Sequence, residues 1–127
     1  MATQNNSIRS FQPTAALSAY RVVDVGTAGT INYSAVDQRG VGVIQEDTTA
    51  NTYERPAVRL WGTGTFRVAV TGTPLTAGDA MVVVTNGYVS VTNGLVGNSG
   101  VVVGILLETT GPATNGSIRE VAFGVST

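Results

Sequence analysis

AMVVVTNGYVSVT, residues 80–92, is the segment with the clearest structural signal in this chain. The run Met81–Val84 is continuously apolar, which is typical of a strand covered on both faces. Asn86-Gly87 follows before a second valine-rich run, and this dipeptide between apolar runs is the strongest short-range signal for a hairpin with a type I′ turn. Just upstream, Thr76-Ala77-Gly78-Asp79 is typical of a tight turn. The segment therefore predicts a turn followed by a β-hairpin.

The chain from Tyr20 onward carries the same β signal. Valine and threonine dominate it, and both favour the pleated, half-buried surface of a strand. No long segment shows helical periodicity. Short apolar runs recur at a spacing of roughly 8–12 residues, which predicts an all-β fold, a small compact β-barrel or sandwich of short antiparallel strands. The expected strands are Tyr20–Val25, Thr30–Tyr33, Gly40–Gln45, Ala57–Trp61, Thr65–Val70, Ala80–Thr85, Tyr88–Thr92, Val101–Glu108 and Ile118–Val125.

Two windows of the chain resemble each other. Gly42–Gly62 aligns with Gly104–Gly124 without a gap, and Trp61 then meets Phe123. Each window reads as a strand, an acidic residue, a polar loop, a second strand and an aromatic residue before glycine. Gly and Thr are common in this chain, so chance similarity is the competing explanation. The alignment predicts two similar halves related by a pseudo-twofold axis, which requires the same strand order in both.

Residues 1–19 differ from the rest of the chain. They are rich in Asn, Gln and Ser, and their apolar residues are sparse: Ile8, Phe11 and then Leu17. Pro13 biases the residue before it toward extended backbone. We therefore expect an extended N-terminal arm over residues 1–19 and a single β-domain over residues 20–127. A frayed terminus is the plain alternative, whereas Ile8 and Phe11 are what a docking peptide needs.

The composition excludes several classes of function. The chain has 127 residues, which predicts one domain; it has no cysteine, histidine or lysine, and its seven basic residues are all arginine. Disulfide frameworks, Cys/His zinc sites, Ser–His or Cys–His nucleophiles and lysine Schiff bases all need a residue type that is missing. A net charge of -1 speaks against a nucleic-acid partner. No signal peptide and no apolar run long enough for a membrane span is visible.

Candidate chemical groups are few. Glu46-Asp47 is an adjacent acidic pair, but neighbours on a strand point to opposite faces and do not share a proton. A calcium site at this strand end would need more oxygen ligands in a suitable spacing, so solvated acids are the plainer expectation. Trp61 is either a platform for a ligand or, more commonly, a core plug or subunit contact. Arg55 and Arg59 form only a weak anion patch. We expect no catalytic, cofactor-binding or metal site and no small-molecule substrate.

Between Gly40 and Gly124 a series of short motifs recurs in a characteristic order. They are Gly42-Val43-Ile44, Glu46-Asp47, Val58-Arg59-Leu60-Trp61-Gly62, Leu75-Thr76-Ala77-Gly78-Asp79-Ala80, Asn86-Gly87-Tyr88-Val89, Val103-Gly104-Ile105-Leu106-Leu107-Glu108 and Ile118–Gly124. In order and spacing they resemble the small all-β decoration proteins of tailed-phage heads, also called capsid cement or head-stabilising proteins. The departures are the missing lysine, often present at the hairpin in that family, and the long loop Asp47–Glu54, whose role stays open.

The resemblance implies a structural virion protein that is not an enzyme and uses no cofactor. Such proteins bind the outer surface of the mature capsid, commonly as homotrimers that clamp neighbouring capsomers. The implied partner is the major capsid protein, with no nucleic acid and no membrane. The implied location is the outer capsid surface, after assembly in the host cytoplasm. The candidate residues are Ile8, Arg9, Phe11 and Pro13 for the capsid-binding arm, and Arg55, Arg59 and Trp61 for subunit interfaces.

Two further features of the residues agree with this role. An extended arm can bind by strand addition. Charged residues make up only 12% of the chain, and interface cores are depleted of charge and of lysine while arginine is enriched, so we expect several arginines at contacts.

Three alternatives stay open. The Thr- and Asn-rich loops Asp47–Glu54 and Leu107–Ser117 are also typical of a carbohydrate-binding or adhesive β-module of a phage tail or fibre. The others are a trimeric enzyme that uses Asp or Glu between subunits, and a β-domain with a packing role only.

Overall fold

The structure is a computed structural model and describes residues 8–26, 29–36, 38–49, 51, 53–62, 64–71, 77–91, 102–107 and 117–123. No helix in this part of the chain is long and apolar enough to cross a membrane. Every strand expected from the sequence is present, with ends that differ by a few residues. The strands are β1 (Ile8–Ser10), β2 (Gln12–Pro13), β3 (Ala16–Leu17), β4 (Val22–Val25), β5 (Thr30–Tyr33), β6 (Gly42–Ile44), β7 (Thr48–Thr49), β8 (Ala57–Leu60), β9 (Gly64–Ala69), β10 (Ala80–Val83), β11 (Val89–Val91), β12 (Val102–Leu106) and β13 (Ile118–Phe123).

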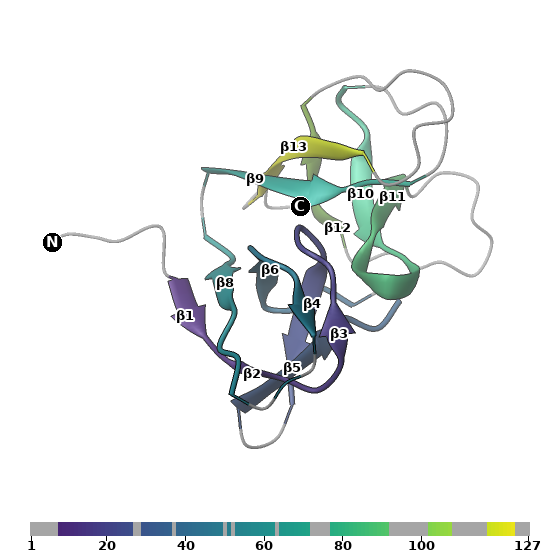
Figure 1. The fold of residues 1–127 in the computed structure, drawn as a ribbon. Coiled ribbons are helices and arrows are strands. Elements are labelled where there is room, and N and C mark those ends of the chain that lie inside the picture. The colour runs from purple at the N-terminus through teal and green to yellow at the C-terminus, as the bar shows by residue number, and fades with distance from the viewer. Residues whose placement is uncertain are drawn as a thin grey trace, which may run out of the picture.

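Two sheets make up most of the fold (Figure 1). The first, here called the N-sheet, has the strand order β1-β8-β6-β4-β5-β2, and the second, the C-sheet, has the order β11-β10-β12-β13-β9. Neighbouring strands are antiparallel except β2 and β5, which are parallel. Strands β3 and β7 form a separate pair. The chain is therefore all-β, as predicted, and its sheets form a sandwich and not a closed barrel.

Two apolar cores lie on opposite faces of the N-sheet. Val22 and Val43 face the C-sheet, where they join a cluster built mostly from β9, β10, β12 and β13 around Phe66. Their chain neighbours Val23 and Ile44 face the other way, because side chains alternate along a strand. The N-sheet is thus apolar on both faces and needs a cover on each.

Residues of the predicted arm supply the second cover. Leu17 is 2% exposed and belongs to the second core, and Phe11 and Ala15 pack against it. Strand β1 pairs with β8, and β2 pairs with β5. The sequence-based boundary between an arm (residues 1–19) and a domain (residues 20–127) therefore does not coincide with a boundary in the packing. Residues 1–7 of that arm lie outside the described residues.

The predicted hairpin has the predicted turn. Asn86 has φ 57° and ψ 30°, and Gly87 has φ 74°, so both central residues adopt the left-handed backbone that a type I′ turn requires. The N–H of Tyr88 donates to the carbonyl oxygen of Thr85 at 3.2 Å and closes the turn. The flanking strands pair from Val83 opposite Val89. The type I′ turn that Asn86-Gly87 predicts is therefore confirmed.

The two sheets share one topology, as the internal alignment requires. In chain order, β1, β4, β5, β6 and β8 of the N-sheet correspond to β9, β10, β11, β12 and β13 of the C-sheet, and the order across each sheet is the same. The registers differ by one residue, because Gly42 lies opposite Leu60 whereas Gly104 lies opposite Phe123. The window end at Gly124 lies outside the described residues. The prediction of two similar halves is confirmed at the level of strand order.

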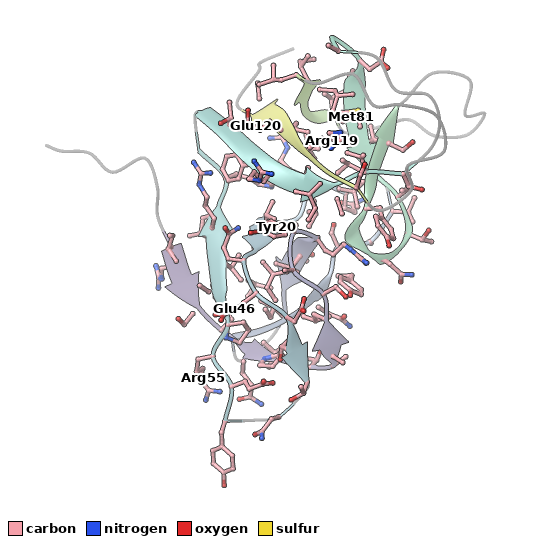
Figure 2. The ribbon with its side chains drawn as sticks, turned by 45° about the horizontal axis from the view of Figure 1, so that its top comes forward. Tyr20, Glu46, Arg55, Met81, Arg119 and Glu120 are labelled. Carbon is pink, nitrogen blue, oxygen red and sulfur yellow. The ribbon has the colours of Figure 1, made fainter. Side chains whose placement is uncertain are left out.

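Tyr20 and Arg21 join the two sheets through hydrogen bonds, and Figure 2 shows Tyr20 between them. Tyr20 has φ 64°; its N–H donates to Ile44 in β6 and its carbonyl accepts from Ala69 in β9, both at 2.7 Å. Arg21 reaches the C-sheet hairpin, where it donates to the hydroxyl of Tyr88 at 2.8 Å and stacks 3.8 Å from the centroid of that ring. The left-handed backbone at Tyr20 is therefore held by a hydrogen bond to each sheet.

Candidate functional site

Three of the four outer edges of the N-sheet and the C-sheet are protected within the described residues. At β2, the N–H of Thr14 donates to β5, so the backbone nitrogen of the buried Pro13 points away from β5, and proline has no N–H to offer there. At β9, Ala69 donates to Tyr20, and Arg59 Nη1 donates to the carbonyl oxygen of Thr65 at 2.7 Å. At β11, a hydrogen bond from Thr71 to Val89 covers the outer side. Native sheets block edges in these ways to prevent pairing with other chains.

The fourth edge, β1, lies at the margin of the N-sheet, and in the described residues no proline and no hydrogen bond from another segment covers it (Figure 1). Arg9 is in register with Val58 of β8, and the N–H of Phe11 donates to Pro56 at 3.4 Å. Backbone groups alternate in direction along a strand, so those of Ile8 and Ser10 point away from β8. The side chains of Ile8, Arg9 and Ser10 are all exposed. This edge can accept an additional strand.

The predicted capsid-binding residues divide into two pairs. Ile8 is 57% exposed and Arg9 is exposed, both on the open edge. Phe11 is half-buried against the second core, and Pro13 is buried in β2. The latter two hold the segment on the N-sheet, and the former two are exposed, so a role of these four residues in capsid binding stays a prediction. The structure thus brings the four residues into one segment with two different environments.

The predicted interface residues Arg59 and Trp61 make contacts within the chain. The guanidinium of Arg59 lies 4.1 Å from the centroid of the Phe66 ring, and Trp61 meets the same ring edge-on at 4.9 Å. Trp61 Nε1 donates to the carbonyl oxygen of Arg39 at 2.9 Å, and its ring packs against the core between the sheets. Arg55 is exposed. Arg59 and Trp61 therefore help close the sandwich, and a role of these three residues in subunit contacts stays a prediction.

The loop from Asp47 to Glu54 is organised by the Glu54 carboxylate. Its Oε1 accepts hydrogen bonds from the Thr48 hydroxyl at 2.6 Å, from the N–H and hydroxyl of Thr49 at 2.8 and 3.0 Å, and from the N–H of Asn51 at 3.2 Å. These bonds, with that from Thr48 first, lower the pKa of Glu54, and desolvation only partly opposes them. The loop holds Tyr53 outward at 90% exposure. Sequence reasoning left this loop open.

The acidic pair before this loop has a structural use. Glu46 Oε2 accepts from the N–H of Ala57, and Asp47 Oδ1 accepts from the N–H of Ala19, at 2.8 and 2.7 Å. With Glu54, Arg55 and others these acids line a cavity of about 140 Å³. Within the described part of the chain, no group of three or more acidic side chains is arranged to hold a metal ion. The carboxylates fasten the loop to the strands on either side.

Comparison with known proteins finds a likeness in structure. No protein-family model matches this chain, and no curated protein matches it in sequence. Among solved structures, it resembles the head fiber gp8.5 N base of bacteriophage phi29 with a TM-score of 0.74. The likeness covers 94% of each chain at 15% sequence identity. At that identity the two chains share a fold.

Proposed function

We propose that this chain is a structural protein of a tailed-phage virion that decorates the outer surface of the capsid. The observation that carries the proposal is the shared fold with the base of a phage head fiber, over nearly the whole of both chains. The motifs that resemble capsid decoration proteins support the same assignment from the sequence. The role is non-enzymatic, and the partner is the major capsid protein.

The open β1 edge supports a mechanism for attachment. An extended segment of the capsid protein would add to the N-sheet beside β1, with main-chain hydrogen bonds supplying affinity and side-chain contacts supplying specificity. Ile8 and Arg9 are the side chains that such a segment would meet first. If only the expanded lattice presents the segment, binding stabilises the mature capsid by mass action. Many copies on one lattice make weak single contacts effective together.

The assembly that we propose is a homotrimer that clamps neighbouring capsomers. A mass measurement in solution tests the oligomeric state independently of capsid binding. The location on the outer surface, after assembly in the host cytoplasm, is part of the same proposal. A gene for a major capsid protein beside the gene of this chain is expected, and its absence would count against the assignment.

Co-sedimentation tests the attachment directly. Purified chain is mixed with capsids assembled from the neighbouring capsid protein, in the expanded and the unexpanded state, and only the expanded capsids should carry it down. Ile8→Lys places a charge on the open edge and should weaken binding by about tenfold or more. Val36→Lys is the matched control, because Val36 is 49% exposed and lies outside β1. Equal binding of both variants would exclude the β1 edge as the attachment site.

A further inference from the structure

An open groove of about 390 Å³ runs along the β4–β5 hairpin of the N-sheet. Thr14, Asp24, Asn32 and Tyr33 are among the residues that line it. The Tyr33 ring packs on the second core, whereas the side chains of Asp24 and Asn32 are exposed on the other face of the hairpin. The volume falls in the range of sites for small ligands. None of the contacts described above for capsid attachment or loop organisation uses Asp24 or Asn32.

Asp24 and Asn32 form a matched pair across the hairpin. They lie directly opposite each other in the β4–β5 register, and both are exposed. Facing side chains of an antiparallel pair stand about 5 Å apart on one face. In each residue, Oδ1 accepts the N–H of the following residue, at 2.9 Å for Asp24 and 2.8 Å for Asn32. Among the described residues neither side chain has another partner.

This arrangement leaves one acceptor beside one donor. With Oδ1 engaged, Asp24 offers its second carboxylate oxygen, and Asn32 offers its amide N–H groups. A hydroxyl group can donate to the first and accept from the second at the same time. Two neighbouring hydroxyls on one ring can also share the task, one donating to Asp24 and the other accepting from Asn32. Sugars offer both single hydroxyls and such neighbouring pairs.

Tyr33 and Thr14 are fixed at the rim of the same groove. The Tyr33 hydroxyl accepts the N–H of Ser18 at 2.9 Å, which leaves its own hydrogen to donate. Arg21 lies 5.5 Å from the centroid of the Tyr33 ring. The Thr14 hydroxyl donates to the carbonyl oxygen of Ile31 at 2.9 Å and keeps its oxygen as an acceptor. The groove is therefore lined by groups whose positions are set before any ligand binds.

A peptide strand is the alternative occupant. In the N-sheet, β6 pairs with β4 only at Val22 and Val23, and β2 pairs with β5 only at Thr30 and Ile31. Asp24 and Asn32 lie past these paired residues, and their Oδ1 atoms already engage the N–H groups of Val25 and Tyr33. A ligand at this pair therefore meets side-chain groups first, which suits a polyhydroxylated ring.

We propose that the β4–β5 groove binds a carbohydrate, with Asp24 as acceptor and Asn32 as donor to hydroxyls of one pyranose unit. This inference is independent of capsid decoration, since it uses a different face and different residues. Single-site affinity is expected in the millimolar range, and display of many copies would raise the effective affinity. A sugar-binding protein on a particle surface would hold that particle to glycan-bearing surfaces.

The test uses the whole chain. Binding is measured on a printed glycan array, and by saturation-transfer NMR with methyl α-D-mannopyranoside, methyl β-D-galactopyranoside and N-acetyl-D-glucosamine. Asp24→Asn and Asn32→Asp each keep the Oδ1 bond but leave two donors or two acceptors, and each should weaken binding by about tenfold or more. The double variant that carries both Asp24→Asn and Asn32→Asp again has one donor and one acceptor, so it should regain part of the lost sugar affinity. Glu120→Gln in β13 (Figure 2) removes the same charge in the other sheet and should bind as the unaltered chain does.

Two results would overturn the proposal. One is no signal for any sugar on the array or in the NMR measurements. The other is sugar binding that Asp24→Asn and Asn32→Asp leave at the level of Glu120→Gln. Amide spectra of each variant establish that the fold is intact. Neither result bears on capsid attachment, because the Ile8→Lys experiment is read on a different partner.

Discussion

Gly42→Ala and Gly104→Ala should each destabilise the fold, because these glycines occupy equivalent places in the two sheets. A Cβ on Gly42 would lie 2.2 Å from the carbonyl oxygen of Arg59, and one on Gly104 would lie 2.4 Å from that of Ala122. Ordinary van der Waals contact begins at 3.4 Å, so the neighbouring strand would have to move by about 1 Å. Both obstacles are main-chain atoms of a paired strand, which cannot rotate away as a side chain can.

The size of the effect follows from that displacement. Moving a strand by about 1 Å stretches hydrogen bonds of about 2.9 Å beyond their useful range, and roughly two such bonds cost about 1 kcal/mol each. Overpacking adds about 1–3 kcal/mol, and the lower entropy of the unfolded alanine chain offsets about 0.4–1 kcal/mol. The expected net loss is about 2–4 kcal/mol for each variant. At this chain length, Tm should fall by roughly 6–15 °C.

Thermal and urea unfolding, followed by circular dichroism, measure this loss. Gly26→Ala is the matched control, because its new Cβ would meet first the side-chain oxygen of Thr30 at 3.2 Å, which can move aside. That variant should stay within about 0.5 kcal/mol of the unaltered chain. If Gly42→Ala and Gly104→Ala shift Tm no more than Gly26→Ala, the close approach of the strands at these glycines is not a constraint on the fold.

Substitutions at three further residues test the contacts between the two sheets and the hydrogen bonds of the Asp47–Glu54 loop. Arg21→Ala should cost about 1–3 kcal/mol in chemical unfolding, because it removes hydrogen bonds and a stacked guanidinium between the sheets, and Arg21→Lys should not restore the loss. Trp61→Phe keeps a ring beside Phe66 but loses the bond to Arg39 and should cost about 1 kcal/mol, whereas Trp61→Ala should cost about 2–4 kcal/mol. The lowered pKa of Glu54 means that its stabilisation of the loop is present above the unfolded-state pKa and is lost as pH falls through the folded-state pKa. The amide shifts of the N–H groups that it accepts should titrate in that acid range, and Glu54→Gln should abolish the titration; an unchanged titration would assign it to another group.

Much of the strand layout could be predicted from the sequence, because the longer strands carry their own signal. Runs such as Met81–Val84 are apolar enough, and Asn86-Gly87 is specific enough, for local rules to suffice. Strands β2, β3 and β7 have two residues each, which is too short for any periodicity. The adjacent apolar pairs Val22-Val23 and Val43-Ile44 did carry a usable signal, since a strand that is apolar on both faces needs two covers. The N-terminal arm, residues 1–19, was the remaining segment that could supply the second cover of the N-sheet.

The candidate surfaces could be predicted less well from the sequence, because they depend on which strands pair with each other. Ile8 and Arg9 can be noticed in the sequence as side chains in a polar segment. Whether their strand is an open edge depends on its having a paired strand on one side only, and this pairing is seen only in the structure. The pairing of Asp24 with Asn32 depends on the hairpin register, which nothing local to either residue specifies. The Glu54 loop is different. Thr48, Thr49 and Asn51 lie within six positions of the acid, so the donors could have been recognised from the sequence.

The exclusive use of arginine has a partial explanation inside the chain. Arg21 and Arg59 stack on aromatic rings while donating hydrogen bonds, which a lysine ammonium cannot do with the same geometry. Arg67 lies opposite Glu120 in the C-sheet register. Arg9 is exposed on β1 and has no partner in the described part of the chain. It is therefore the first arginine that we expect at a contact with the capsid lattice.

Arg9 also disfavours pairing of β1 with the β1 strand of a second copy of the chain. The antiparallel register that uses all of Ile8–Ser10 would set Arg9 against Arg9 of the partner, and like charges directly opposite are destabilising. A different strand with a carboxylate at that position avoids the conflict. Arg9→Gln should therefore weaken capsid binding by about two- to fivefold at low salt and reduce its salt dependence, whereas Arg67→Gln should not. Sedimentation across a salt series distinguishes the two, and an identical salt response of both variants would place the capsid contact elsewhere.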